Sequence, residues 1–194
     1  MPKRSIGAIP YLYPVPIVLV GATVEERPNY ATVGDCAIMG IRPPLVAISL
    51  GESAFTTRGI REVGSFSVNV PTTEMLSLVD YFGTVSGKDV DKSALVESIP
   101  GTVPDVPLLS ACPVNLECRV IEECKVEHRH VFVAEVVEAH VDERFVTDVE
   151  GRPRIAPLQD LDPILYALDN TYYSVGRPIG TGYREAERFP RRRL

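Results

Sequence analysis

One polar loop concentrates residue types that bind phosphate groups. The stretch YFGTVSGKDVDK, Tyr81 to Lys92, carries an SGK run in the order that ends a Walker A motif. A P-loop needs GxxxxGK followed by Ser or Thr, placed between a buried strand and a helix. Here Gly83 is one residue too close to Gly87, Asp89 replaces the hydroxyl that would hold magnesium, and the loop follows a predicted helix. The loop therefore offers donors to an anion without indicating an NTPase.

Other chemically capable residues do not form recognisable sites. The cysteines at positions 36, 112, 118 and 124 include no CxxC pair, so we expect free thiols in a reducing compartment. His128 and His130 would project from the same side of a strand, but no third ligand is evident, and no metal site is predicted. The GxG at 180–182 lacks the surrounding strand and helix of a dinucleotide fingerprint.

Composition excludes several classes of protein. The 194 residues are 45% apolar and 24% charged, which is typical of one globular domain, here 1–194. A net charge of −6 argues against a nucleic-acid partner, and the basic run Arg188 to Arg193 is expected to be a solvated end. No signal peptide is recognisable, and the longest apolar run, Val15 to Ala22, is too short to span a membrane. We therefore expect a cytoplasmic protein without a membrane partner.

The hydrophobic pattern indicates mainly strands. Alternating or β-branched runs predict strands at Pro16–Val24, Leu45–Leu50, Phe66–Val70 and Val114–Val141, the last as two strands with a turn near 127–129. The proline-rich piece 99–107 is linker-like. Many strands with few helices favour a barrel or sandwich over alternating βα units.

Two helices are predicted. The first starts at Thr56, whose hydroxyl would cap the first turn, and stops at Gly64. The second places an apolar stripe on one face and ends near Gly83; the stripe consists of Met75, Leu78, Val79 and Phe82.

Five motifs in order resemble the flavin reductase-like family, the FMN-binding split β-barrels that include flavoredoxins. They lie between Tyr13 and about His140: YPVPIVLVGATVEERPNYATVG, RPPLVAISL, TTRGIREVGSFSVNVP, DYFGTVSGKDVDK and HRHVFVAEVVEA. Each motif is weak alone, and the five in register carry the resemblance. It implies a mainly β, Greek-key split β-barrel with a few short peripheral helices. The core would span about 13–141, and segment 142–194 would pack on the barrel or on a dimer partner.

The resemblance implies an FMN phosphate site. Thr56 would present its hydroxyl and the positive helix end to the phosphate, although taken alone it is equally a plain N-cap. Lys92 would contact the phosphate or the flavin edge, whereas alone it would be a surface lysine. Ser86, Gly87 and Lys88 would supply a hydroxyl, a flexible backbone and a second cation.

Other residues are implied around the flavin ring. Asn29 and Thr32 would make polar contacts, whereas alone they would be turn and strand-surface residues. Ser49 and Leu50 would offer backbone groups to the ring edge. His130 opens the H-x-F-x-x-E-V strand and would lie near the cofactor or the incoming nicotinamide as a titratable donor, a catalytic role.

The chain departs from the family pattern at two positions. Ala54 stands where many relatives carry a basic residue, so the phosphate would rely on Lys92, Lys88 or Arg58. Asp35 stands where an aromatic is common, and its negative charge beside the ring would lower the flavin potential. Three tyrosines would either cover the ring or pack in the core or an interface: Tyr166, Tyr172 and Tyr173.

The resemblance implies a homodimer that transfers electrons. Hydride would pass from NAD(P)H to flavin N5, and the electrons would leave to free flavin, ferric iron or a partner protein. One alternative is a flavoredoxin-like carrier that is reduced by a protein donor without NAD(P)H turnover. Another is a split barrel that has lost FMN and binds a different small ligand.

Overall fold

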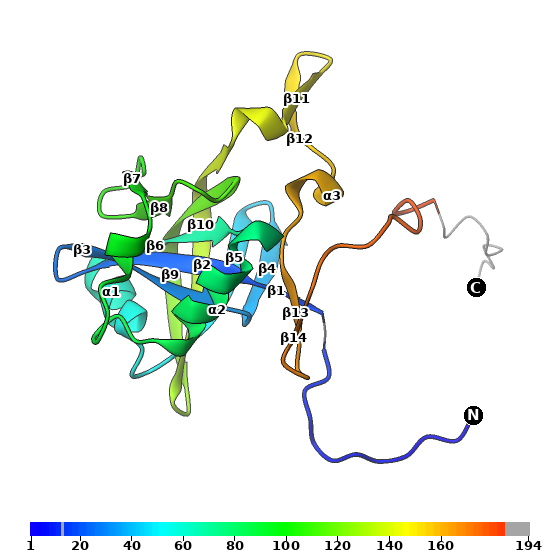
Figure 1. Ribbon diagram of the computed structural model, residues 1–194, viewed down its shortest axis with the longest axis horizontal. Helices are drawn as coiled ribbons and strands as arrows, with labels where there is room; N and C mark the ends of the chain where they lie inside the picture. Colours follow the sequence, from blue (N-terminus) through cyan, green and yellow to red (C-terminus); the bar gives the residue numbers. More distant parts are fainter. Residues whose placement is uncertain (13, 185–194) are drawn as a thin grey trace.

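A seven-stranded antiparallel sheet forms the body of the molecule (Figure 1). The computed structural model describes residues 1–12 and 14–184. The strand order is β3-β2-β6-β9-β10-β5-β4. In chain order these strands are β2 (Val18–Val24), β3 (Arg27–Val33), β4 (Cys36–Ile41), β5 (Pro44–Gly51), β6 (Ser65–Val70), β9 (Val114–Val126) and β10 (Arg129–Val141).

The sheet curves around a core of aliphatic and aromatic side chains. Strands β5, β6, β9 and β10 carry the predicted pattern, and their inward side chains are buried together with those of β2. The most enclosed members of this cluster include Val20, Ile48, Ile60, Phe66 and Phe132. Strand β3 also approaches β5, which brings the two ends of the sheet toward each other. The predicted mainly β fold is confirmed.

The first helix covers one end of this body. Helix α1 (Phe55–Val63) ends at Gly64, which adopts a left-handed conformation (φ 74°), as predicted. The predicted cap is wrong: the N-cap is Ala54, which has no side chain to bond, and Thr56 lies inside the helix. A Cβ on Gly59 would lie 2.5 Å from the Thr23 carbonyl oxygen, so the helix depends on glycine to pack this closely on β2.

A second apolar cluster lies on the outer face of β2 and β3. Helix α2 (Leu76–Thr84), preceded by the 3-10 turn η1 (Thr73–Met75), buries Val79 and Phe82 there against Tyr30. Three short strands from both ends of the chain join this layer: β1 (Val15–Pro16), β13 (Leu165–Ala167) and β14 (Thr171–Tyr173).

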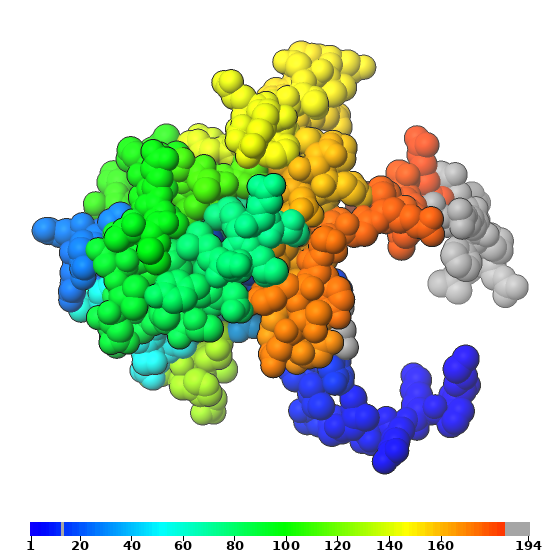
Figure 2. Space-filling view, in the orientation of Figure 1, coloured from blue at the N-terminus to red at the C-terminus, as the bar shows by residue number. Residues whose placement is uncertain are grey.

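Several further short elements lie around this body. They are η2 (Lys92–Leu95), η3 (Glu143–Phe145), α3 (Leu158–Leu161) and the hairpin β11 (Val146–Val149) and β12 (Arg152–Ile155). Figure 2 shows this hairpin and the N-terminal segment standing away from the body. The basic run at 188–193 lies outside the described residues.

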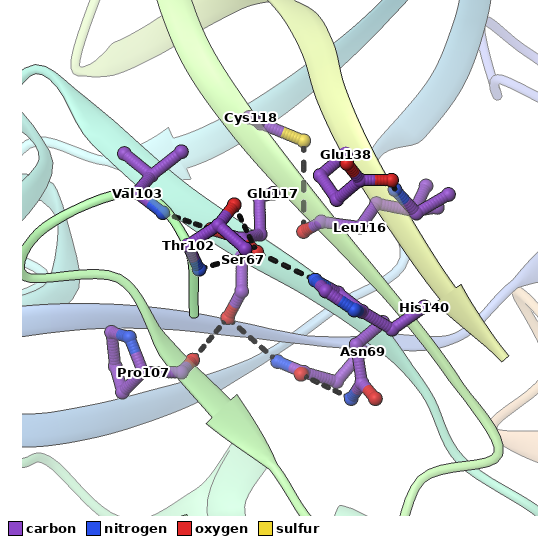
Figure 3. Close-up of polar contacts among 12 residues, drawn as sticks. Ser67, Asn69, Thr102, Val103, Pro107, Leu116, Glu117, Cys118, Glu138 and His140 are labelled. Carbon is purple, nitrogen blue, oxygen red and sulfur yellow. Dashed lines mark hydrogen bonds and ion pairs between the residues drawn. The ribbon is translucent and has the colours of Figure 1, made fainter. Parts of the chain in front are cut away.

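The proline-rich piece is not a linker. It forms the hairpin β7 (Ser98–Pro100) and β8 (Pro107–Leu109), and the loop between them is held by the fully buried carboxylate of Glu117 on β9 (Figure 3). Glu117 accepts the backbone N–H groups of Thr102 and Val103 at 2.8 and 2.6 Å. Its third partner is His140 Nε2, at 2.6 Å. The composition of the 99–107 segment did not reveal this contact, because the accepting carboxylate of Glu117 lies on β9.

Replacement of Glu117 by Gln tests the anchor. Burial raises the pKa of this carboxyl, but hydrogen bonds from Thr102, His140 and Val103 outweigh burial and hold the pKa below its ordinary 4.5. The anchor therefore contributes stability that is present above pH 4.5 and is lost as pH falls through the lower folded-state pKa. We expect Glu117→Gln to lower the free energy of unfolding by about 2–4 kcal/mol at pH 7, because an amide N–H₂ faces two N–H donors. In urea titrations this deficit should shrink below pH 4.5. Exposed Glu138 on β10 is the matched control, and equal stability of Glu117→Gln and Glu138→Gln would contradict the anchor.

Candidate functional site

A polar hollow of about 470 Å³ lies between the strand ends, the start of α1 and the loop after α2. It is within the usual size range of small-molecule sites. All but two of the predicted site residues line it: Asn29, Thr32, Asp35, Ser49, Leu50, Thr56, Ser86, Gly87 and Lys92. The fold thus gathers residues from five separate segments of the chain.

One end of the hollow, here called the anion end, is built around Thr56. Asn29, buried on β3, donates from Nδ2 to Thr56 Oγ1 at 2.7 Å, which leaves the Thr56 hydroxyl proton for another acceptor. The hydroxyls of Ser53 and Ser86 lie in the same lining. The first N–H groups of a helix lack intrahelical partners, and α1 has no side-chain cap. This end therefore presents donors and a positive helix dipole.

Gly87 lets the loop after α2 come close to the anion end. A Cβ at this position would collide with Asn29 Oδ1 and would lie 2.9 Å from a ring carbon of Phe55. Only a residue without a side chain fits there, so the backbone of the loop forms part of the hollow.

Lys92 is a buried lysine. Its ammonium donates to the carbonyl oxygens of Tyr30 at 2.9 Å and Phe82 at 2.8 Å, and it lies 5.3 Å from the centre of the Phe82 ring. Burial lowers the pKa of Lys92 to about 8. Two of its three N–H donors therefore join β3 to the end of α2, and the third has no hydrogen-bond acceptor among the described residues.

The other cations considered for a phosphate lie elsewhere. Lys88 is exposed and outside the lining of the hollow. Arg58 points to solvent and pairs with Glu25 at 2.6 Å and Glu62 at 2.8 Å.

The opposite end, here called the Arg129 end, holds a charge pair. Arg129, at the start of β10, donates from Nε to Ser49 Oγ and from Nη2 to the Ser49 carbonyl oxygen, both at 2.8 Å. Nη2 also pairs with the carboxylate of Asp35, just after β3. The acid that sequence reasoning placed beside the ring is therefore balanced by a cation.

His130 lies outside the hollow. Its Nδ1 contacts Glu123 Oε1 at 2.5 Å, and its ring stacks near Phe132. Successive strand residues face opposite sides, so the side chain that reaches the hollow from this strand end is that of Arg129. His128 lies in the exposed β9–β10 turn. The sequence analysis named His130, whose side chain faces the core of the sheet, and did not name Arg129, whose side chain lines the hollow.

A second, apolar hollow of about 610 Å³ adjoins the first. The two share Thr32, Gly34, Asp35 and Ser49. Tyr166 and Tyr172 line the apolar hollow, with ring centres 5.0 Å apart, while Tyr173 is exposed. Tyr172 donates to Asp80 Oδ1 at 2.8 Å, and burial raises its pKa to about 12, so it stays a neutral wall.

Metal clusters and membrane-spanning helices are absent from the described part of the chain. Its His, Cys, Asp and Glu side chains do not come together in any group of three or more suited to a metal. Its helices include none with the length and hydropathy needed to cross a membrane.

Comparison with known proteins supplies the family. The family described as flavin reductase like domain matches residues 11–170. The chain belongs to the flavin reductase-like family. An NADH-dependent FMN reductase of Streptomyces nodosus subsp. asukaensis is 29% identical over 150 residues, or 73% of this chain and 74% of that protein.

Solved structures of the flavin reductase-like family match the fold. A flavoredoxin from Methanosarcina acetivorans superimposes with a TM-score of 0.90 and 34% identity, covering 97% of this chain and 99% of that one. Flavoredoxin of Desulfovibrio vulgaris (Miyazaki F) gives a TM-score of 0.84 and 31% identity, covering 94% and 98%. The predicted split β-barrel and family are confirmed.

Sequence reasoning missed several residues of the site, including a cation, a hydroxyl and an aromatic ring. Arg129, Ser53 and Phe55 all line the polar hollow. Ser53 and Phe55 flank Ala54, the N-cap of α1, so an accurate helix start would have indicated them. Arg129 lies beside His130, and the alternation of the strand was the available signal.

Lys92 and Lys88 form a matched pair, one buried and one exposed lysine in the same segment. We expect Lys92→Met to lower the free energy of unfolding of the ligand-free protein by about 1–3 kcal/mol, because the carbonyls of Tyr30 and Phe82 lose their donor. Lys88→Met should stay within about 0.5 kcal/mol of the original chain. Urea denaturation of both variants measures the difference. Equal effects would show that the Lys92 contacts carry no stability.

Proposed function

We propose that this chain binds FMN in the polar hollow and acts as an NAD(P)H-dependent flavin reductase-like oxidoreductase. The observation that carries the proposal is the convergence of five chain segments on one hollow with an anion end. Membership of the flavin reductase-like family and likeness to flavoredoxins support the choice of cofactor.

The anion end fits a phosphate. The hydroxyls of Ser53, Thr56 and Ser86, the start of α1 and the Gly87 backbone supply donors from several directions. The remaining N–H of Lys92 adds positive charge. Ala54 at the start of α1 offers no charged side chain, so in this proposal the phosphate is bound mainly by hydroxyl and backbone donors.

The Arg129 end and the apolar hollow fit the flavin ring. Ser49 and the backbone near Leu50 offer polar groups, and Val131 and Tyr166 offer apolar walls. The Thr32 hydroxyl donates to the Val79 carbonyl oxygen at 2.6 Å, so it can only accept a hydrogen bond from the ring. When bound, FMN would supply the capacity to take a hydride from a nicotinamide and to transfer its electrons to an acceptor. The protein residues hold the ring, exclude water from one face and set the surrounding charge. His130 is 4% exposed and outside both linings, so in this proposal it supports β10 through Glu123 and does not reach the ring.

The homodimer remains part of the proposal. Strand β4, at the edge of the sheet, exposes Ile38, Met39 and Ile41, at 72%, 59% and 74% of their surface. Such an apolar edge next to the hollows is suited to a second copy of the chain. The ring site would then be completed across the interface.

The second candidate is a flavoredoxin-like carrier without its own NAD(P)H turnover. It is favoured by the 34% identity to the Methanosarcina flavoredoxin over nearly the whole chain. The loss of FMN in favour of another small ligand is the remaining alternative.

FMN uptake tests the cofactor assignment. We expect the purified protein to show flavin absorption and to bind FMN more tightly than riboflavin, which lacks the phosphate. Thr56→Val should weaken FMN binding by about 1–2 kcal/mol, or roughly 5–30-fold, and leave riboflavin binding nearly unchanged. Fluorescence titration measures both affinities. Equal losses for FMN and riboflavin would place the phosphate elsewhere. A colourless protein that takes up no flavin would favour the alternative in which the barrel has lost FMN and binds another small ligand.

Stopped-flow reduction separates the enzyme from the carrier. We expect the flavin absorbance to bleach with a rate that saturates in NADH or NADPH. A protein that binds FMN but is reduced by dithionite and by neither nucleotide would identify the carrier.

A further inference from the structure

The polar hollow contains few charged side chains that can face a ligand. Its lining includes Asp35, Lys92 and Arg129 as the titratable residues. Lys92 is 3% exposed, and two of its donors are used by backbone carbonyls near the anion end. The Arg129 side chain is 39% exposed and stands at the other end. Arg129 is therefore the accessible cation of the hollow.

The guanidinium of Arg129 is fixed on one edge and open on the other. Nε and Nη2 make the contacts with Ser49 and Asp35 described above. Within the described part of the chain Nη1 has no hydrogen-bond partner. A planar guanidinium held by Nε and Nη2 keeps its Nη1 edge in a defined direction.

The geometry separates this cation from the phosphate. Asn29 marks the anion end, and Asp35 lies six positions further along β3 and the residues just after it. An extended chain rises roughly 3.3 Å per residue, so these six positions span at most about 20 Å. The hydrogen bonds of the Arg129 guanidinium all go to Ser49 and Asp35 and none to Asn29 or Thr56. A ligand with its phosphate beside Thr56 would therefore bring its ring, and not its phosphate, toward Arg129.

We propose that Arg129 and Asp35 together set the reduction potential of the bound flavin, with Arg129 favouring the reduced form and Asp35 opposing it. The inference rests on the proposed FMN site. At neutral pH the reduced ring carries negative charge that the oxidised ring lacks, so a nearby cation stabilises the reduced form selectively. The sequence analysis expected Asp35 alone to lower the potential. Because Asp35 is paired with Arg129, the net shift of the potential is the difference between the opposite effects of the two charges.

The experiment measures midpoint potentials of the FMN-loaded protein and three variants by dye-coupled titration. Arg129→Gln should lower the potential by about 30 mV, which corresponds to a tenfold loss of preference for reduced over oxidised FMN in a two-electron couple. Asp35→Asn should raise it by about 15–30 mV, or roughly three- to tenfold. The double variant should return close to the original value. All shifts should diminish at high salt, because both side chains are partly solvated.

Two controls separate charge from structure. Arg129→Lys keeps the charge and should keep most of the potential. Arg144→Gln removes another exposed arginine that is paired with Asp142 outside both hollows, and it should leave the potential unchanged. A merely structural role of Arg129 would not produce opposite shifts in the two single variants.

The outcomes distinguish this inference from the function it rests on. FMN uptake by the original chain, followed by potentials within about 5 mV for all variants, would overturn the inference and leave FMN binding intact. Shifts of the same sign for Arg129→Gln and Asp35→Asn would also overturn it. Failure of the original chain to take up FMN would overturn both.

Discussion

The long antiparallel pairing of β9 with β10 is the constraint on which the rest of the structure depends. Each strand has thirteen residues, and the ladder runs from Arg129 opposite Val126 to Val141 opposite Val114. Register shifts after Val133 and Val136 bend the pair, as bulges do. β6 pairs with β9 and β5 pairs with β10, so the curvature of the ladder passes to both halves of the sheet. Arg129 reaches the hollow because this ladder starts there.

Two buried charged side chains join the sheet to neighbouring elements, one as a hydrogen-bond donor and the other as an acceptor. Lys92 donates to backbone carbonyls of β3 and α2, whereas Glu117 accepts backbone N–H groups of the 98–107 hairpin. Each charge is thus satisfied mainly by main-chain groups that regular secondary structure leaves unpaired. In the described residues every buried side-chain nitrogen and oxygen has a partner. The contacts of Lys92 and of Glu117 form only in the folded barrel, because each side chain bonds to residues that are distant in the sequence or belong to another element.

The sequence predicted the fold well because its signals are local. Strand alternation, the stop at Gly64 and the apolar stripe with Val79 and Phe82 each require only a few neighbouring residues. The short strands β11 to β14 were not predicted because they contain too few residues to show an alternating pattern. Strand β3 was not predicted because Pro28 and Asn29 favour a turn. In the structure, pairing with β2 overrides that preference.

The sequence predicted which residues line the candidate site better than it predicted what each of them does there. The motif resemblance named most residues that line the hollow, but it could not say which donors were already used. Lys92 is committed to two carbonyls, Asp35 is paired with Arg129, and Thr56 receives a hydrogen bond from Asn29. Such assignments depend on distances across the closed sheet, and no spacing along the chain encodes them.

The anchored hairpin has a consequence for limited digestion of the protein. A protease needs several residues of its target in an extended, unattached form, and a proline-rich, glycine-containing loop between 98 and 107 would ordinarily supply them. Here the backbone N–H groups of Thr102 and Val103 are bound to a carboxylate inside the body, and Ser67 donates to the Pro107 carbonyl oxygen at 2.5 Å. Cleavage at this loop therefore requires local unfolding of the barrel wall. The exposed hairpin of β11 and β12 has no such attachment to the described core strands and would be cut before this loop.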